Sequence, residues 1–184
     1  MSRPSLFRIT AGVVALLAIG GTAVAIGAPR QPRLGPPPQG RPFDAFVFFR
    51  GESLGEAVLH LPFGRRKTIQ VESRGTVLGD QLQLVQTIRQ NGKARTREWQ
   101  LHRIAPGRYT GTLTDADGPV EAVEDGGRLT IRYHARAGFE VTQVLDRVAD
   151  GEVRNTLTAR IAGLPIAVLN ETIVTAPAPE PQSL

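Results

Sequence analysis

The chain has 184 residues and contains no cysteine, one tryptophan, twenty glycines and fourteen prolines. This length fits one domain of ordinary size, and the absence of cysteine excludes disulfides, thiolate metal sites, cysteine nucleophiles and a lipid attached to an N-terminal cysteine. The formal charge of +5 comes from 22 basic and 17 acidic residues, an excess too small to indicate a nucleic-acid partner.

The first predicted element is an apolar helix near the amino end. Arg3 and Arg8 precede the uncharged residues 9–28, ITAGVVALLAIGGTAVAIGA, which as a helix are about 30 Å long and can span a bilayer. Small residues at 23 and 25 also fit a signal-peptidase site. Residues 1–28 are therefore predicted to be either a signal peptide cleaved after Ala25 or a single-span membrane anchor, and both alternatives favour export of the body.

Proline marks both ends of the body. Residues 29–42, PRQPRLGPPPQGRP, contain six of the fourteen prolines, and the tail at 176–184 contains three more. Such a composition favours extended polyproline geometry, at about 3.1 Å per residue. Residues 29–42 are predicted to be a linker that could reach about 40 Å, and residues 176–184 a disordered tail.

Residues 43–175 are predicted to form one all-β domain. Apolar residues alternate at period two with arginine, threonine and glutamine, and turn residues such as Asn91-Gly92 and Asp150-Gly151 interrupt the pattern. Sequential hairpins of this kind either stack as a sandwich or close into an antiparallel up-and-down barrel, and closure is favoured because it leaves no edge strand. The predicted strands are 45–49, 57–61, 68–73, 81–89, 96–104, 108–115, 119–124, 128–135, 139–148, 152–161 and 165–174.

No group of residues indicates catalysis. His60, His102 and His134 each occur singly in a strand, without a partner at i+2 that would complete a metal site or a general base. The sequence from Asp115 to Gly118 imitates the start of a calcium loop, but its twelfth position is Gly126 instead of glutamate. The chain is therefore predicted not to be an enzyme and to need no metal or cofactor.

The densest basic run is Arg65-Arg66-Lys67. No aromatic residues that could stack on bases are interleaved with it. It is predicted to be a solvated hairpin end, with contact to anionic lipid headgroups as the alternative.

Four neutral amides interrupt apolar strand faces. A buried amide without a partner costs about 1 to 3 kcal/mol, so each of them needs a hydrogen-bond partner. One interpretation is that neighbours in the core satisfy them or that a bulge turns them outward. The other is that they line a mostly apolar cavity and bind the polar end of an amphipathic ligand, flanked by Trp99 and Tyr109. The four amides are Gln86, Gln143, Asn155 and Asn170.

An ordered set of residues in the middle of the body resembles a known family. The set comprises Arg97 and Trp99, then Tyr109, Gly111 and Asp115, then Gly118, and finally Arg132 with Tyr133. It resembles the lipocalin-like bacterial envelope proteins grouped as domain of unknown function 3833, over residues 43–174. The resemblance implies a calycin-type barrel outside the cytoplasm with no established reaction, and an arginine, Arg97 or Arg132, stacked on Trp99. Many relatives are lipoproteins, so in this cysteine-free chain the tether would be the apolar helix.

The prediction is thus an exported lipocalin-like barrel, periplasmic or anchored in the inner membrane by residues 9–28, with no nucleic-acid partner. Its expected function is to bind or carry a lipid or another hydrophobic small molecule without catalysis. One alternative is a structural or protein-interaction barrel with a filled core. Another is an enzyme acting on envelope lipids, which requires a carboxylate or histidine inside the barrel beside the amides. An interior cavity of about 300 Å³ or more would favour the carrier over the filled core.

Overall fold

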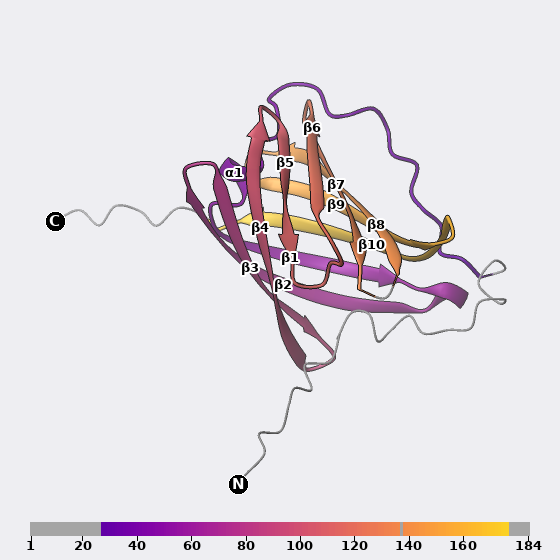
Figure 1. Cartoon of the computed structure of the whole chain (residues 1–184). Helices are drawn as coiled ribbons and strands as arrows, with labels where there is room; N and C mark the ends of the chain where they lie inside the picture. The colour runs from indigo at the N-terminus through magenta and orange to yellow at the C-terminus, as the bar shows by residue number, and fades with distance from the viewer. Residues whose placement is uncertain (1–26, 137, 177–184) are drawn as a thin grey trace, which may run out of the picture.

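The computed structural model describes residues 27–136 and 138–176 of the chain. In this part ten antiparallel strands form one closed barrel in which each strand pairs with its neighbours in sequence and β1 pairs with β10 (Figure 1). The all-β prediction and the closed barrel are confirmed. The elements are α1 (Ala45–Phe48), β1 (Gly51–His60), the short 3-10 helix η2 (Pro62–Gly64), β2 (Arg66–Leu78), β3 (Gln81–Gln90), β4 (Lys93–Ala105), β5 (Arg108–Leu113), β6 (Val120–Asp125), β7 (Arg128–Ala135), β8 (Phe139–Ala149), β9 (Glu152–Ile161) and β10 (Leu164–Thr175).

The alternation of side chains explains the strands. On β2, Ile69 and Val71 are buried while the alternate residues Thr68 and Gln70 are exposed, as expected where one face of a sheet packs on a core. Register shifts between residues 103 and 105, 147 and 149, and 165 and 167 interrupt the ladders. Bulges of this kind increase local twist, which helps a sheet to close.

The segment at 45–49 was predicted to be a strand and is instead mostly helix α1. The Asp44 carboxylate caps it by accepting hydrogen bonds from the backbone N–H groups of Phe46, at 2.8 Å, and Val47, at 3.1 Å, a local effect that the apolar run AFVFF does not reveal. Phe46 is buried under this turn while Val47 is 71% exposed. Helix α1 therefore closes one end of the barrel, which we call the closed end.

Residues 27–42, here called the strap, lie along the outside of the barrel instead of projecting from it (Figure 1). Hydrogen bonds join Arg160 to the Gln31 side chain at 2.6 Å, Arg128 to the Gly35 carbonyl at 3.0 Å, and the Gly127 N–H to the Pro38 carbonyl at 3.0 Å. Val168 and Thr158 point outward on neighbouring strands, yet they are only 0% and 2% exposed. We attribute their burial to the strap, which occupies the position of the predicted linker.

The remaining predictions concern the two ends of the chain. The predicted apolar helix over 9–28 lies outside the described residues except for Gly27 and Ala28, which begin the strap and are not helical. Residues 177–184 of the predicted tail also lie outside them. Among the described residues, no helix has the length and apolar character needed to cross a membrane.

Candidate functional site: a cavity in the barrel

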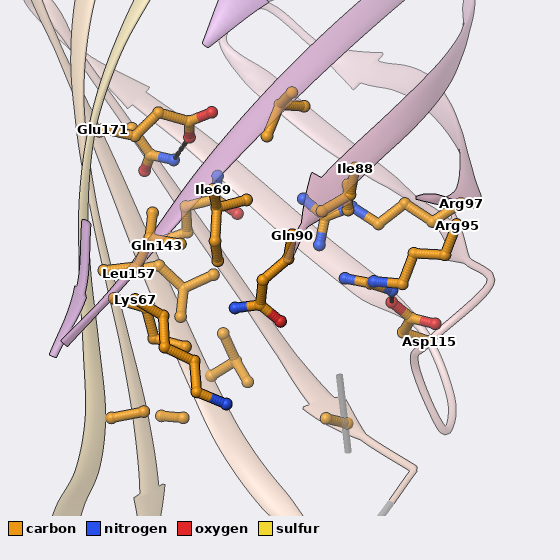
Figure 2. A pocket seen from close by; sticks show the side chains of 18 of the residues that line it. Lys67, Ile69, Ile88, Gln90, Arg95, Arg97, Asp115, Gln143, Leu157 and Glu171 are labelled. Atoms are coloured by element: carbon orange, nitrogen blue, oxygen red, sulfur yellow. Dashed lines mark hydrogen bonds and ion pairs between the residues drawn. The ribbon is translucent and has the colours of Figure 1, made fainter. Parts of the chain in front are cut away.

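A cavity of about 580 Å³ occupies the half of the barrel opposite α1 (Figure 2). It is lined near the β3–β4 turn by the exposed residues Asn91 and Lys93, so it opens to solvent there. We call this end, formed by the β1–β2, β3–β4, β7–β8 and β9–β10 turns and the β5–β6 loop, the open end. The volume lies in the range of small-molecule sites, about 300 to 1,000 Å³.

Most of the cavity wall is apolar. Leucine, isoleucine and valine side chains from β1, β2, β3, β8, β9 and β10 surround the space, and Phe139 closes it beside the β7–β8 turn. Such a wall favours the apolar part of a ligand because contact removes hydrocarbon surface from water. The apolar members are Leu59, Leu61, Ile69, Val71, Ile88, Ala94, Ala135, Phe139, Val141, Leu157, Ala159, Ala167 and Leu169.

A carboxyl group lies inside this cavity. The Asn155 side-chain amide donates a hydrogen bond of 2.7 Å to Glu171, and the two residues are only 1% and 8% exposed. A side chain at position 55 would collide with the Glu171 carboxyl, so Gly55 gives that group its room. Burial raises the pKa of Glu171, while the Asn155 hydrogen bond and the positive charge of Arg97 act in the opposite direction.

Two side-chain oxygens at this place have no hydrogen-bond partner among residues 27–136 and 138–176. They are Oε1 of Gln143 and Oδ1 of Asn155, on residues that are 6% and 1% exposed. Leaving a buried acceptor unpaired costs about 1 to 3 kcal/mol. The two oxygens and the Glu171 carboxyl, here called the acceptor site, all line the cavity and can each receive a donated hydrogen bond.

Charged residues line the other side of the cavity. Figure 2 shows Glu171 and Gln143 on one side and Arg95, Arg97 and Asp115 on the other. Arg95 forms an ion pair of 2.9 Å with Asp115, and burial lowers the pKa of Arg95. Both lysines of the chain, Lys67 and Lys93, also line the cavity.

Gln86 fits the interpretation that the buried amides are satisfied by their neighbours in the core. It is buried but does not line the cavity. Its amide donates to the Ser73 hydroxyl at 3.0 Å, and its carbonyl oxygen accepts from Arg97 Nε and Trp99 Nε1, each at 2.8 Å. Gln86 is therefore a satisfied core amide, and its proposed role in ligand binding is corrected.

The aromatic residues of the predicted site lie elsewhere. Trp99 packs in the core under Arg97, whose guanidinium lies 5.2 Å from its ring, and it meets Tyr133 edge-on at 5.9 Å. Arg132 is exposed, so Arg97 is the arginine that stacks on Trp99. Tyr109 lies at the closed end, where its hydroxyl donates to Glu124 at 2.5 Å. Neither Trp99 nor Tyr109 lines the cavity.

The prediction for Asn170 is corrected by strand register. Ala167, Leu169 and Glu171 face the cavity, so Asn170 faces outward with Val168. The apolar Ile166 and Val168 suggested that their face was internal, but the strand has a register shift between Pro165 and Ala167, and Val168 is buried on the outer face. The opposite alternation, from Ala167 to Ile173, could have identified Glu171 as a carboxylate on an apolar face.

The two glycines of the family pattern have structural roles. A side chain at Gly111 would collide with the Gln100 carbonyl of the neighbouring strand. Gly118 has a φ of +94° in the loop after β5, a conformation that favours glycine.

Comparison with known proteins supports the fold. A family described as "Protein of unknown function (DUF3833)" matches residues 38–152, and no curated protein matches the chain. Twelve chains of solved structures match. One of them is the S-type phycobiliprotein lyase CPES from Guillardia theta, at a TM-score of 0.57 and 6% identity, covering 72% of this chain and 91% of that one. These findings confirm the resemblance to a lipocalin-like family.

The same comparison corrects the prediction that the chain is not an enzyme. The similar barrel is a lyase, although at 6% identity the likeness shows only the fold. The prediction depended on the lack of a catalytic motif in the sequence. Glu171 beside Asn155 is the carboxylate inside the barrel that the enzyme alternative requires.

Proposed function

Because this chain belongs to the DUF3833 family, whose function is unknown, we propose a function from its cavity: the barrel binds an amphipathic small molecule, a lipid or another hydrophobic compound with a hydrogen-bond donor at one end. The observation that carries the proposal is the acceptor site, with two unpaired buried oxygens at the wall of a largely apolar cavity of about 580 Å³.

The chemistry of the acceptor site indicates which polar group fits. Gln143 and Asn155 offer carbonyl oxygens and Glu171 offers a carboxyl group, so a hydroxyl can donate to one of these acceptors and an amino group to more than one. A carboxylate brings no donor, so it cannot satisfy the unpaired oxygens of Gln143 and Asn155. The bound molecule therefore places a hydroxyl or amino group at the acceptor site and its hydrocarbon part against the leucine and isoleucine wall.

The comparison with the solved lyase supports a small-molecule ligand. That protein is named as a phycobiliprotein lyase, and its barrel has the same fold as this one. The cavity also argues against the alternative of a barrel filled by its own side chains, since about 580 Å³ exceeds the threshold of about 300 Å³. Export, which the residues before Gly27 predict, remains part of the proposal.

A second candidate function is catalysis on the bound molecule. It is favoured by Glu171, a carboxyl group inside the cavity whose pKa is raised by burial, because a raised pKa lets a carboxyl group keep a proton that it can transfer to a bound molecule. If the bound compound is converted by the wild type and only bound by Glu171→Gln, the cavity is an active site. Binding without conversion in both proteins would leave ligand binding as the function.

The binding proposal is tested by native mass spectrometry of the full chain with two matched probes. Decanol can donate a hydrogen bond, whereas decyl methyl ether has a similar hydrocarbon chain and can only accept. We expect the wild type to prefer decanol and Gln143→Met to lose most of that preference. Gln83→Met, at an exposed position on β3, is the control and keeps it. Equal binding of both probes by the wild type, or no binding of either, would contradict the proposal.

A further inference from the structure

We propose that the open end of the barrel docks on an anionic lipid membrane and that the ligand enters the cavity from that membrane. The docking surface is inferred from observations that do not depend on the proposed function. Only the entry of the ligand from the membrane rests on that function.

The open end exposes apolar side chains beside the cavity. Phe63, next to the β1–β2 turn, is 59% exposed, and Ile161 and Leu164 at the β9–β10 turn are 42% and 47% exposed. Strands β1 and β10 are paired, so these two turns lie side by side, at the right-hand edge of the barrel in Figure 1. Apolar side chains exposed in this way can insert between lipid headgroups.

Positive charge lies at the same end of the barrel. Arg65, Arg66, Lys67 and Lys93 all belong to the β1–β2 or β3–β4 turn regions, and none forms an ion pair with any carboxylate of residues 27–136 or 138–176. Of the two carboxylates in the loop after β5, Asp115 is paired with Arg95 and Asp117 is exposed. Basic residues near an anionic bilayer are attracted to its headgroups, so this surface complements an anionic membrane.

The path of the strap supplies a third, independent observation. The Phe63 backbone N–H donates a 3.0 Å hydrogen bond to the Gly27 carbonyl, and a side chain at Gly27 would meet the Phe63 ring. The strap therefore starts at the open end and reaches Phe43 at the closed end. The uncharged sequence that precedes Gly27 is joined to the barrel beside the exposed Phe63, so any membrane attachment through that sequence brings the open end to the lipid.

The closed end provides a contrast. It also exposes apolar residues, with Leu78 at 79% and Ile104 at 63%. However, Asp80 lies in the same turn as Leu78, helix α1 seals the barrel there, and Leu78 and Ile104 do not line the cavity. Exposure of apolar residues is thus common to both ends, whereas the surplus of cations, the cavity and the start of the strap occur together only at the open end.

The absence of cysteine from the chain permits a direct test with the full chain. Leu164→Cys and Leu78→Cys replace exposed leucines next to a glycine turn at opposite ends, and each is labelled with an environment-sensitive fluorophore. The labelled proteins are mixed with vesicles of phosphatidylcholine alone or of phosphatidylcholine and phosphatidylglycerol, with nitroxide-bearing lipids as quenchers. We expect the label at 164 to be quenched several-fold more than the label at 78 on the anionic vesicles.

Charge removal and a ligand probe complete the experiment. Adding Arg65→Gln, Arg66→Gln and Lys93→Gln should reduce quenching at 164 on anionic vesicles to the level found on neutral ones. Equal quenching at the two positions, stronger quenching at 78, or quenching at 164 that does not depend on vesicle charge would overturn the proposal. Decanol binding by the same proteins without vesicles separates the two ideas: docking without decanol binding removes the proposed function alone, and decanol binding without docking removes this inference alone.

Discussion

Two glutamines buried in this barrel differ in what their carbonyl oxygen contacts. Gln86 accepts hydrogen bonds from Arg97 and Trp99, whereas Oε1 of Gln143 has no partner in the part of the chain that the structure describes. The two residues are 7% and 6% exposed, so burial alone does not distinguish them. The difference separates a residue that holds the fold together from one that is available to a ligand.

For Gln86 we expect a structural effect. Gln86→Met removes the acceptor of two buried donors, Arg97 Nε and Trp99 Nε1, and should lower the free energy of unfolding by about 2 to 4 kcal/mol. Urea denaturation measures this change. Gln83→Met, at an exposed position on the same strand, is the control and should change stability by less than about 0.5 kcal/mol. Equal stability of the two variants would show that the network contributes little.

For Glu171 we expect a pH-dependent effect. Its pKa in the folded state is raised above the ordinary value of 4.5, so the folded protein retains a proton that the unfolded chain releases. The stability contributed in this way is complete below about pH 4.5 and is lost as the pH rises through the folded-state pKa. Relative to the wild type, Glu171→Gln should therefore gain stability as the pH increases above 4.5, and the gain should level off above the folded-state pKa.

Denaturation curves across this pH range provide the measurement. Glu124, whose pKa burial also raises, is present in both proteins and cancels from the comparison. Glu121→Gln, at an exposed position on β6, should follow the wild type at every pH. If the Glu171→Gln curve also runs parallel to the wild type, the carboxyl group is not titrating in a buried site.

At the scale of elements, the strap determines which barrel end lies near the preceding sequence. Position 127 is one of its contacts: a Cβ there would lie 2.9 Å from the Pro38 carbonyl oxygen. Gly127→Ala should therefore loosen the strap and speed trypsin cleavage after Arg33, followed by mass spectrometry. Gly35→Ala lies on the strap itself, where a Cβ would meet nothing within 4 Å, and should leave the rate unchanged. The same cleavage rate in both variants would mean that this contact does not hold the strap.

At the scale of the whole molecule, much of the fold could be predicted from the local sequence pattern. Of the eleven strands that period-two alternation predicted, ten correspond to strands of the barrel, and the evenly spaced turns favoured closure. Alternation shows which residues share a face, but it does not show which face is internal, and for this reason Asn170 was chosen and Glu171 was missed. The helix at 45–48 depends on one capping carboxylate, and the strap depends on contacts far apart in sequence, such as Gln31 with Arg160.

The residues that line the cavity could likewise be predicted only in part from the sequence. Gln86, Gln143 and Asn155 all follow the internal register, but only the latter two line the cavity. Which buried amides are satisfied depends on cross-strand neighbours, here Ser73, Arg97 and Trp99 for Gln86. The sequence could therefore propose candidates for a ligand site, and three-dimensional contacts were needed to separate them.

The central claim is that the acceptor site is kept for a ligand at a cost to the empty protein. Its most direct test is the free energy of unfolding of the wild type and Gln143→Met, each without ligand and with decanol. Because methionine has a similar size and no unpaired oxygen, we expect the empty variant to be more stable than the empty wild type by about 1 to 3 kcal/mol. We also expect decanol to stabilise the wild type more than the variant. A variant that is less stable when empty, or that gains as much from decanol as the wild type, would contradict the account.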